Sequence, residues 1–147
     1  MRGIVIADID GTVALMGKGD PSRRGPYDWH RVGEDDPNTP IIELVRVLRT
    51  AGHRIVFVSG RDEECRLVTQ HWLLEHGAAT GFGPGRDQLF MRESGDNRGD
   101  DVVKLEIYKR DIVPIGLVDY VLDDRNKVVH MWRSIGLTVL QVQDGDF

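Results

Sequence analysis

Short apolar runs alternate with amphipathic segments along most of the 147-residue chain. Apolar runs predict one strand that begins at Ile4 and further strands over residues 54–58, 88–91, 117–122 and 138–142. Apolar residues at helical spacing predict helices over residues 39–51, 62–76, 100–110 and 128–135. Because strands and helices alternate, we expect a Rossmann-like α/β fold with a mainly parallel sheet and helices on both faces.

One long segment interrupts this alternation. Residues 13–38 are rich in Gly, Pro, Asp and Arg and show no steady period, which predicts a loop or small flap rather than a large cap domain. Loops of this length in compact domains are usually functional. We expect the flap to be an insertion in a single domain spanning residues 1–147, an ordinary domain length. After the flap, Thr39 is expected to be a helix N-cap and Pro40 the first helical residue.

Composition limits the classes of function. The formal charge is −5, so the protein as a whole does not attract nucleic acid and any phosphate binding must be local. Cys65 is the single cysteine, which excludes an internal disulfide, fits a reducing compartment and predicts a buried thiol. The sequence shows neither a leader nor an apolar run of membrane-spanning length. We therefore expect an intracellular, cytoplasmic protein without a membrane partner.

Polar side chains follow three of the predicted strands at the point where each ends. They are Asp8 and Asp10 after the first strand, Ser59, Gly60 and Arg61 after the second, and Asp123 and Asp124 after the strand over residues 117–122. In an open α/β sheet, ligands bind at the carboxyl ends of the strands, so we expect these groups to share one site. Asp8 and Asp10 are expected to point in different directions and to have different roles.

The chemistry of this predicted site favours a phosphate ester. Four carboxylates in one crevice would repel one another unless a hard cation neutralised them, and oxygen ligands of this kind suit Mg²⁺. Arg61, together with Lys104 on the helix over residues 100–110, adds positive charge that attracts an anion. Phosphoryl transfer depends mainly on positioning and on stabilisation of spread negative charge, which metal and cations supply together.

The same residues resemble a known family. Asp8-Ile-Asp-Gly-Thr12, Ser59, Lys104 and Asp123-Asp124 are similar to the four motifs of the haloacid dehalogenase superfamily of phosphotransferases, in the same order. Further strings resemble the 3′-phosphatase domain of phage-type polynucleotide kinase-phosphatase over nearly the whole chain. They are Arg24-Gly-Pro-Tyr-Asp28, Val58-Ser-Gly-Arg61, Gly95-Asp-Asn-Arg98, Asp100-Asp-Val-Val-Lys104, Asp123-Asp-Arg125, Val128-Val-His-Met-Trp-Arg133 and Gln141-Val-Gln-Asp-Gly-Asp-Phe147.

The resemblance implies a two-step mechanism. Asp8 would attack phosphorus to form an aspartyl-phosphate, and Asp10 would protonate the leaving oxygen and later take a proton from water. Mg²⁺ would be bound by Asp8, by Asp124 and by the backbone carbonyl of Asp10. Asp123 is either a support for this site or the ligand itself, because the sequence does not separate adjacent residues.

The resemblance also assigns residues to the phosphate. Ser59, Gly60 and Lys104 would hold the phosphoryl oxygens, while Arg24 and Arg61 would hold substrate or transition-state charge. Asp100 is placed among the substrate-binding residues, but it is also a plausible N-cap of its helix. Both roles can coexist if Asp100 orients Lys104, which lies one helical turn later.

The expected function is therefore Mg²⁺-dependent removal of 3′-terminal phosphate from DNA or RNA. One alternative is a phosphatase for mononucleotides or other small phosphate esters, and another is a non-enzymatic module that binds phosphorylated nucleic-acid ends. The glycine-rich phosphate loop of the family's kinase module does not occur in these 147 residues. We therefore expect a phosphatase that stands alone, with a separate kinase or ligase as a candidate partner.

Other conspicuous residues have ordinary interpretations. The tryptophans Trp29, Trp72 and Trp132 are expected to pack in the interior, with stacking of a terminal base by Tyr27 or Trp29 as a minor alternative. Four arginines are expected to be surface charges: Arg23, Arg86, Arg92 and Arg98.

Overall fold

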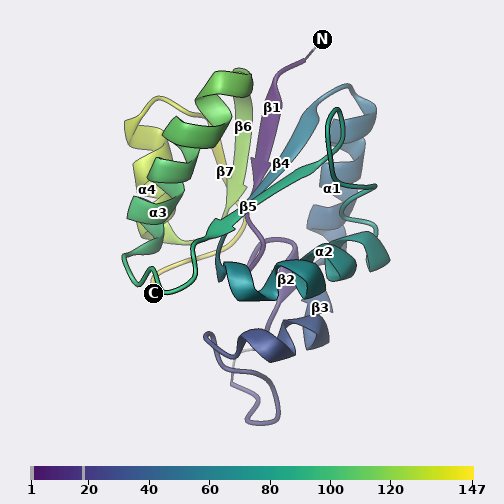
Figure 1. Cartoon of the computed structure of the whole chain (residues 1–147), viewed down its shortest axis with the longest axis vertical. Helices are drawn as coiled ribbons and strands as arrows, with labels where there is room; N and C mark the ends of the chain where they lie inside the picture. The colour runs from purple at the N-terminus through teal and green to yellow at the C-terminus, as the bar shows by residue number, and fades with distance from the viewer. Residues whose placement is uncertain (1, 18) are drawn as a thin grey trace.

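The computed structural model describes residues 2–17 and 19–147. Its main feature is a five-stranded, entirely parallel sheet in the order β5-β4-β1-β6-β7, which confirms the predicted α/β fold (Figure 1). Its strands are β1 (Ile4–Ala7), β4 (Arg54–Asp62), β5 (Gln88–Arg92), β6 (Val118–Asp123) and β7 (Val139–Gln141). The helices between them are α1 (Thr39–Thr50), α2 (Arg66–Glu75), α3 (Asp100–Ile107) and α4 (Asn126–Ser134).

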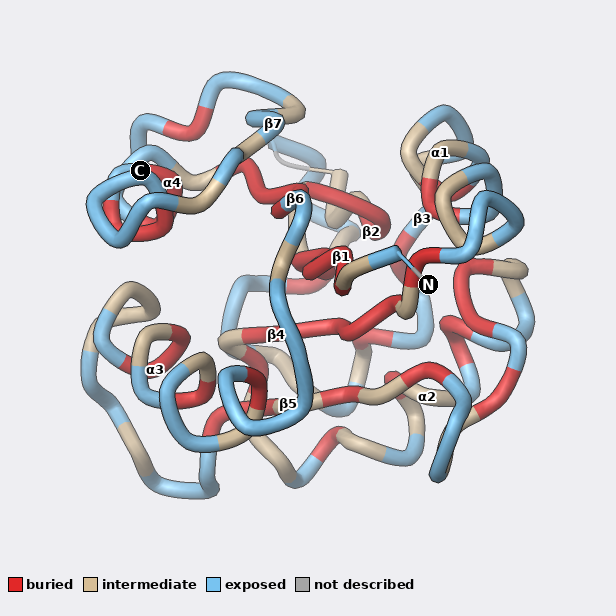
Figure 2. The backbone as a smooth tube through the Cα atoms, turned by 90° about the horizontal axis from the view of Figure 1, so that it is seen from above, coloured by how far each residue is buried: buried red, intermediate tan, exposed pale blue. Residues whose placement is uncertain are grey.

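The helices cover both faces of the sheet. Seen from above, α1 and α2 lie on one side, whereas α3 and α4 lie on the other (Figure 2). Successive side chains of a strand point to opposite faces, so β1 contributes to two separate cores. Val5 and Ala7 belong to the core under α1 and α2, whereas Ile4 and Ile6 belong to the core under α3 and α4. This burial on both faces explains why β1 is apolar at every position.

The predicted flap has internal structure. Within residues 13–38, β2 (Ala14–Leu15) and β3 (Asp36–Pro37) form an antiparallel pair, and Trp29–Glu34 form the 3₁₀ helix η1. Lys18 lies outside the described residues. Figure 1 shows the flap below the carboxyl ends of the sheet strands, and Val13 and Val32 anchor it in the core. The flap therefore faces the edge of the sheet at which the predicted site lies.

Two predicted helix caps are wrong by one residue. Asn38, not Thr39, is the N-cap of α1, because its carbonyl accepts the first helical hydrogen bond, from the amide of Ile42. Gly99, not Asp100, is the N-cap of α3, and its carbonyl accepts from Val103. Asp100 is therefore the first residue inside the helix, where its carboxylate is free to form tertiary contacts.

The largest differences from the expected element boundaries are at the end of β4, the start of α2 and the end of α3. β4 extends to Asp62, so Ser59, Gly60 and Arg61 lie within the strand and not after it. A short 3₁₀ turn, η2 (Glu63–Cys65), then leads into α2, which begins at Arg66. At its far end, α3 passes at Tyr108 into a π-helical turn, η3 (Tyr108–Ile112), followed by the 3₁₀ turn η4 (Val113–Ile115).

Among the described residues, the structure contains no helix with the length and apolar character needed to cross a membrane. The predicted packing roles of Trp72 and Trp132 are confirmed, since both side chains are buried. Cys65 is a buried free thiol, also as predicted.

Candidate active site

Asp8 lies directly after β1, at the carboxyl edge of the sheet, and its side chain is buried. One carboxylate oxygen accepts a hydrogen bond from Lys104 Nζ at 2.7 Å. The other accepts one from the Thr12 hydroxyl at 3.1 Å. Both oxygens are thus held by donors on opposite sides, which fixes the direction in which Asp8 points.

Asp8 belongs to a cluster of three buried carboxylates. Oxygen atoms of Asp8, Asp123 and Asp124 all lie within 4.8 Å of one another. Burial, and then the charge of Asp123, raise the pKa of Asp8 well above its usual value, and burial also raises the pKa of Asp124. The donor set and this crowding of negative charge fit a hard divalent cation such as Mg²⁺.

Lys104 is the cation beside this cluster. Its Nζ donates to Asp8 and also to Asp123, at 3.0 Å, from a side chain that is itself buried. Burial alone would lower the pKa of Lys104, but the charges of Asp123 and Asp8 outweigh it and raise this pKa. When all three carboxylates are ionised, a single ammonium group does not offset their charge.

Asp123 and Asp124 differ in their hydrogen bonding. Asp123 accepts hydrogen bonds from Lys104, from Trp132 Nε1 at 3.1 Å and from the backbone amide of Asp124 at 2.9 Å. Asp124 Oδ2 accepts one from Gln143 Nε2 at 3.3 Å. The carboxylate of Asp123 is therefore engaged by protein donors at both oxygens, while that of Asp124 has the longer and weaker contact.

Asp10 lies apart from the acidic cluster. Its Oδ1 accepts hydrogen bonds from Arg24 at 2.9 Å and from Arg61 at 2.8 Å. Burial would raise the pKa of Asp10, but Arg61 and then Arg24 lower it overall. Of the four carboxylates expected in one crevice, three form the cluster and Asp10 pairs with arginines instead.

The turn after β1 explains this separation. β1 ends at Ala7, and the amides of Thr12, Val13 and Ala14 donate to the carbonyl of Ile9. Asp8 and Asp10 diverge because of this turn; in a continuing strand, residues two apart would point to the same side. The two carboxylates diverge as predicted, and the turn, not the strand, is the cause.

Sequence reasoning missed Asp35. This buried flap residue accepts hydrogen bonds from Arg24 at 2.7 and 2.8 Å and from Arg61 at 3.0 Å. Asp35 and Asp10 therefore hold the two guanidinium groups between them. The sequence signal was an Asp-Asp pair at the end of the flap, which does not reveal partners that lie 11 and 26 residues away.

Asp100 and Arg92 form the rim of the site. Asp100 accepts hydrogen bonds from Arg92 and, at 2.8 Å, from Arg125, whereas those of Lys104 go to Asp8 and Asp123. The expected orientation of Lys104 by Asp100 is therefore not made through a hydrogen bond. Arg92 was predicted to be a surface charge, but it is buried and donates to the carbonyl of Gly60 at 2.8 Å.

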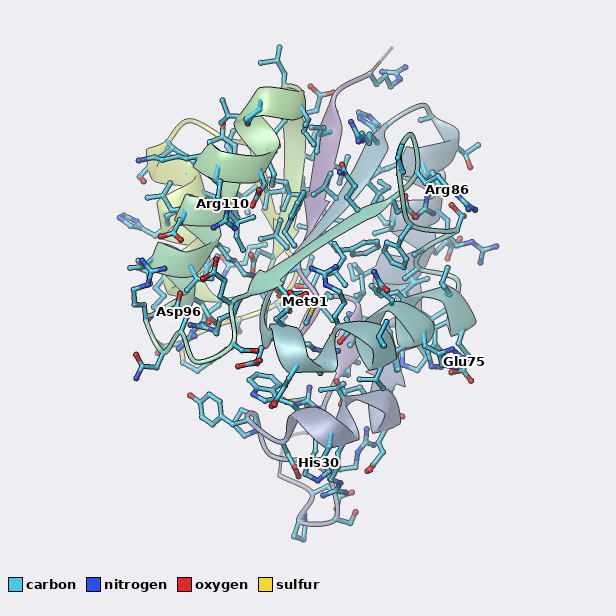
Figure 3. The ribbon with its side chains drawn as sticks, in the orientation of Figure 1. His30, Glu75, Arg86, Met91, Asp96 and Arg110 are labelled. Carbon is cyan, nitrogen blue, oxygen red and sulfur yellow. The ribbon has the colours of Figure 1, made fainter. Side chains whose placement is uncertain are left out.

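Glycine is required at position 60 by this rim. A Cβ added at Gly60 would lie 2.6 Å from Asp100 Oδ1. The neighbouring Ser59 is buried, and its hydroxyl accepts a hydrogen bond from the Arg61 amide at 3.0 Å. Figure 3 shows Met91 near the carboxyl end of β5 and His30 on the flap.

The arrangement matches a known family. Residues 2–147 match the family described as the phosphatase domain of polynucleotide kinase PNKP. The chain belongs to this family. The match confirms the resemblance drawn from the sequence motifs, and it supports a phosphatase.

Two kinds of relatives agree with this assignment. The chain is 36% identical, over 94% of its length, to a protein of Autographa californica nuclear polyhedrosis virus that carries the provisional name bifunctional polynucleotide kinase/RNA ligase. It is also 33% identical to chains in two solved structures, one of the Pnkp1/Rnl/Hen1 complex and one of the Pnkp1/Rnl/Hen1 RNA repair complex. Each of these superpositions covers 99% of the present chain and has a TM-score of 0.87. The chain spans 19% of the viral protein and 47% and 43% of these two chains.

The C-terminal segment of this PNKP-type phosphatase domain supports the acidic cluster. Gln143 Nε2 donates to the carbonyl of Gly11 at 2.7 Å and also contacts Asp124. Gln141 Nε2 donates to the Asp124 carbonyl at 2.9 Å. Gly11 itself has φ +80°, and a Cβ there would lie 2.0 Å from Asp124 Oδ2. The turn after β1 and the loop after β6 are thereby packed directly against each other.

Proposed function

We propose that this chain removes terminal 3′-phosphates from polynucleotides with Mg²⁺ as cofactor. The observation that carries the proposal is the separation of two carboxylates: Asp8 lies in an acidic cluster beside Lys104, and Asp10 lies between Arg24 and Arg61. In this proposal, Asp8 attacks phosphorus and Asp10 moves protons. Membership of the PNKP phosphatase family indicates the ends of nucleic acids as the substrate class.

The metal would be held by the acidic cluster. Asp8 and Asp124 are the proposed side-chain ligands, with the backbone carbonyl of Asp10 as a further ligand. Asp123 is the supporting residue, since its oxygens already accept from Lys104, Trp132 and an amide. When bound, Mg²⁺ would neutralise the carboxylates and polarise a phosphoryl oxygen.

In the first step, a carboxylate oxygen of Asp8 forms a bond to phosphorus as the bond from phosphorus to the 3′ oxygen breaks. Asp10 gives its proton to the departing oxygen. Its arginine partners favour the ionised form of Asp10 in the free site, but an arriving phosphate dianion adds negative charge nearby and raises its proton affinity.

In the second step, Asp10 takes a proton from water, whose oxygen attacks the phosphorus of the aspartyl-phosphate and releases Asp8 and inorganic phosphate. Lys104, the Ser59 hydroxyl and the Gly60 amide would hold the phosphoryl oxygens. Arg24 and Arg61 would keep Asp10 in place and offset transition-state charge. Asp100 would keep the rim of the site in place through Arg92 and Arg125.

A substrate panel tests this proposal. Oligonucleotides of DNA and RNA with 3′ or 5′ phosphate, mononucleotides and a sugar phosphate are each incubated with Mg²⁺ or with a chelator. We expect phosphate release from 3′-phosphorylated ends with Mg²⁺ and its loss on chelation. The Asp8→Asn variant, checked for folding by circular dichroism, is the control. Hydrolysis of the sugar phosphate while the 3′-phosphorylated oligonucleotide survives would reject the polynucleotide substrate.

We also propose that the domain prepares ends for a kinase or ligase, on the same polypeptide or on another. Removing a 3′-phosphate leaves a 3′-hydroxyl, the group that end joining uses, and the names of the relatives include a kinase and a ligase. Joining of RNA that carries 3′-phosphate and 5′-phosphate ends by an RNA ligase should require the active domain. Equal joining with the Asp8→Asn variant would contradict this order of reactions.

A further inference from the structure

The side chain of Tyr27 projects from the flap with 82% of its surface exposed. By contrast, the aromatic rings of Phe57, Trp72 and Trp132 are buried in the core. The Tyr27 ring is therefore available to contact a ligand, and the flap that carries it also carries Arg24.

Tyr27 lies at the tip of a rigid turn. The amide of Asp28 donates to the carbonyl of Gly25 at 3.2 Å, which closes a four-residue turn with Pro26 and Tyr27 at its centre. Proline at this position fixes the backbone in advance. The Tyr27 ring meets Trp29 edge to face, with centroids 6.1 Å apart and an interplanar angle of 83°. Trp29 packs against the core, so the ring is supported while at least one of its faces stays open.

The same turn is tied to the reaction site. The Gly25 carbonyl that closes the turn also accepts a hydrogen bond from Arg24 at 3.1 Å, and Arg24 donates to Asp10 at 2.9 Å. Asp10 is the group proposed to protonate the leaving oxygen, so the leaving nucleoside must lie on the side of Asp10. That side is the one covered by the flap, which lies below the carboxyl ends of the strands in Figure 1.

We propose that Tyr27 forms a stacking subsite for the base of the 3′-terminal nucleotide. Stacking on an aromatic ring tolerates every base, because each base has a flat π face. The charge pattern agrees, since Arg23 is paired with Asp36 and Arg31 with Glu34 on the same flap. These two arginines are therefore neutralised within the flap, whereas the turn presents an exposed ring. This inference rests on the proposed function and specifies how its substrate is recognised.

A kinetic comparison tests the subsite. Two 3′-phosphorylated oligonucleotides differ only at the last position, which carries adenine or a tetrahydrofuran analogue without a base. The wild type should show a KM about tenfold lower for the adenine end. Tyr27→Ala should raise the KM for the adenine end to that of the baseless end and leave kcat and the KM for the baseless end unchanged. Tyr27→Phe should behave as the wild type.

Leu67→Ala is the matched control, because Leu67 is 80% exposed on α2 and outside the flap. It should preserve the difference between the two substrates. The proposal is overturned if Tyr27→Ala changes the KM for both ends equally, because that would mean general damage to the flap. It is also overturned if Tyr27→Ala changes neither KM.

A binding experiment separates this inference from the proposed function. The Asp8→Asn variant is titrated into a 3′-phosphorylated oligonucleotide with 2-aminopurine at its last position, whose fluorescence falls on stacking. Quenching that disappears in Asp8→Asn/Tyr27→Ala supports the subsite; equal quenching in both proteins rejects it. If the wild type releases no phosphate from either oligonucleotide, the proposed function fails, and the quenching result still decides the fate of Tyr27.

Discussion

Asp8 and Asp10 are two residues apart but have opposite electrostatic surroundings. The pKa of Asp8 is raised by burial and by Asp123, whereas that of Asp10 is lowered by Arg61 and Arg24. These directions are opposite to what the proposed roles need, since Asp8 must be ionised to attack and Asp10 protonated to act as an acid; bound Mg²⁺ would lower the pKa of Asp8, and an arriving phosphate would raise that of Asp10. Asp35 sustains this difference, because it holds both arginines in the positions from which they contact Asp10.

Asp35→Asn should therefore slow catalysis while substrate binding is retained. Misplacement of a catalytic group by about 1 Å costs about 100-fold in rate, so we expect kcat to fall by about that factor while the KM changes little. Loss of a charge from this buried group should also cost about 3–5 kcal/mol of unfolding free energy. Urea denaturation and steady-state kinetics measure the two effects.

The adjacent Asp36 provides the control. Its ion pair with Arg23 is largely exposed, so Asp36→Asn should cost at most about 1 kcal/mol. It should leave kcat at the wild-type value. Equal effects of the two substitutions would show that Asp35 has no special role.

The sequence predicted the site residues that belong to a recognisable motif. Asp8, Asp123 and Asp124 meet as expected, because short strings after strands identify them, and Lys104 joins them from the helix that the family motif predicted. Asp35 and Arg92 were missed or misassigned, since a lone charged residue does not reveal whether a distant partner buries it.

At the scale of elements, the turn after β1 and the loop after β6 are packed so closely that a side chain at position 11 does not fit. Gly11, in the turn after β1, would place a Cβ 2.0 Å from Asp124 Oδ2, on the loop after β6. This contact joins the loop of the proposed nucleophile to that of a proposed metal ligand. The strands that bring the loops together could be predicted from apolar periodicity, but the distance between the loops could not, because it depends on tertiary packing.

Gly11→Ala should weaken Mg²⁺ binding as well as stability. Its φ of +80° costs a non-glycine residue about 1–2 kcal/mol, and the Cβ would also displace Asp124. Gly136→Ala is the matched control, because Gly136 has φ +90° and nothing within 4 Å of an added Cβ. Calorimetric titration with Mg²⁺ should show reduced affinity for Gly11→Ala alone. Unchanged affinity would mean that the turn does not position Asp124.

The flap shows a second limit of prediction at this scale. The composition of residues 13–38 predicted the flap itself. It did not predict β2, β3 and η1 within the flap, because each is a short element defined by contacts with the core. The one-residue errors at the N-caps of α1 and α3 have a similar origin. In both cases, the carbonyl of the residue before the expected cap accepts the first hydrogen bond of the helix.

At the scale of the whole molecule, the cations around the site are already paired with carboxylates. Arg24, Arg61, Arg92 and Lys104 all have acidic partners, and the formal charge of the chain is −5. A polynucleotide therefore gains little from long-range attraction. Recognition should be confined to the terminal nucleotide and its phosphate.

Turnover should accordingly depend only weakly on salt. Each phosphate contact contributes about −0.7 to the slope of log affinity against log salt for a single strand, so a slope smaller in magnitude than about 2 corresponds to fewer than about three contacts. The KM of a 3′-phosphorylated oligonucleotide, measured across a range of NaCl concentrations, gives this slope. A much steeper slope would indicate an extended binding track.

The central claim is that Asp8 carries the phosphoryl group. An oligonucleotide with a radioactive 3′-phosphate is mixed with the enzyme and Mg²⁺, and the reaction is quenched in acid within the first turnover. We predict label bound to the protein, on the peptide that contains Asp8, together with an unlabelled 3′-hydroxyl oligonucleotide. Asp8→Asn should acquire no label and release no phosphate. Release of phosphate by Asp8→Asn at the wild-type rate would contradict the account.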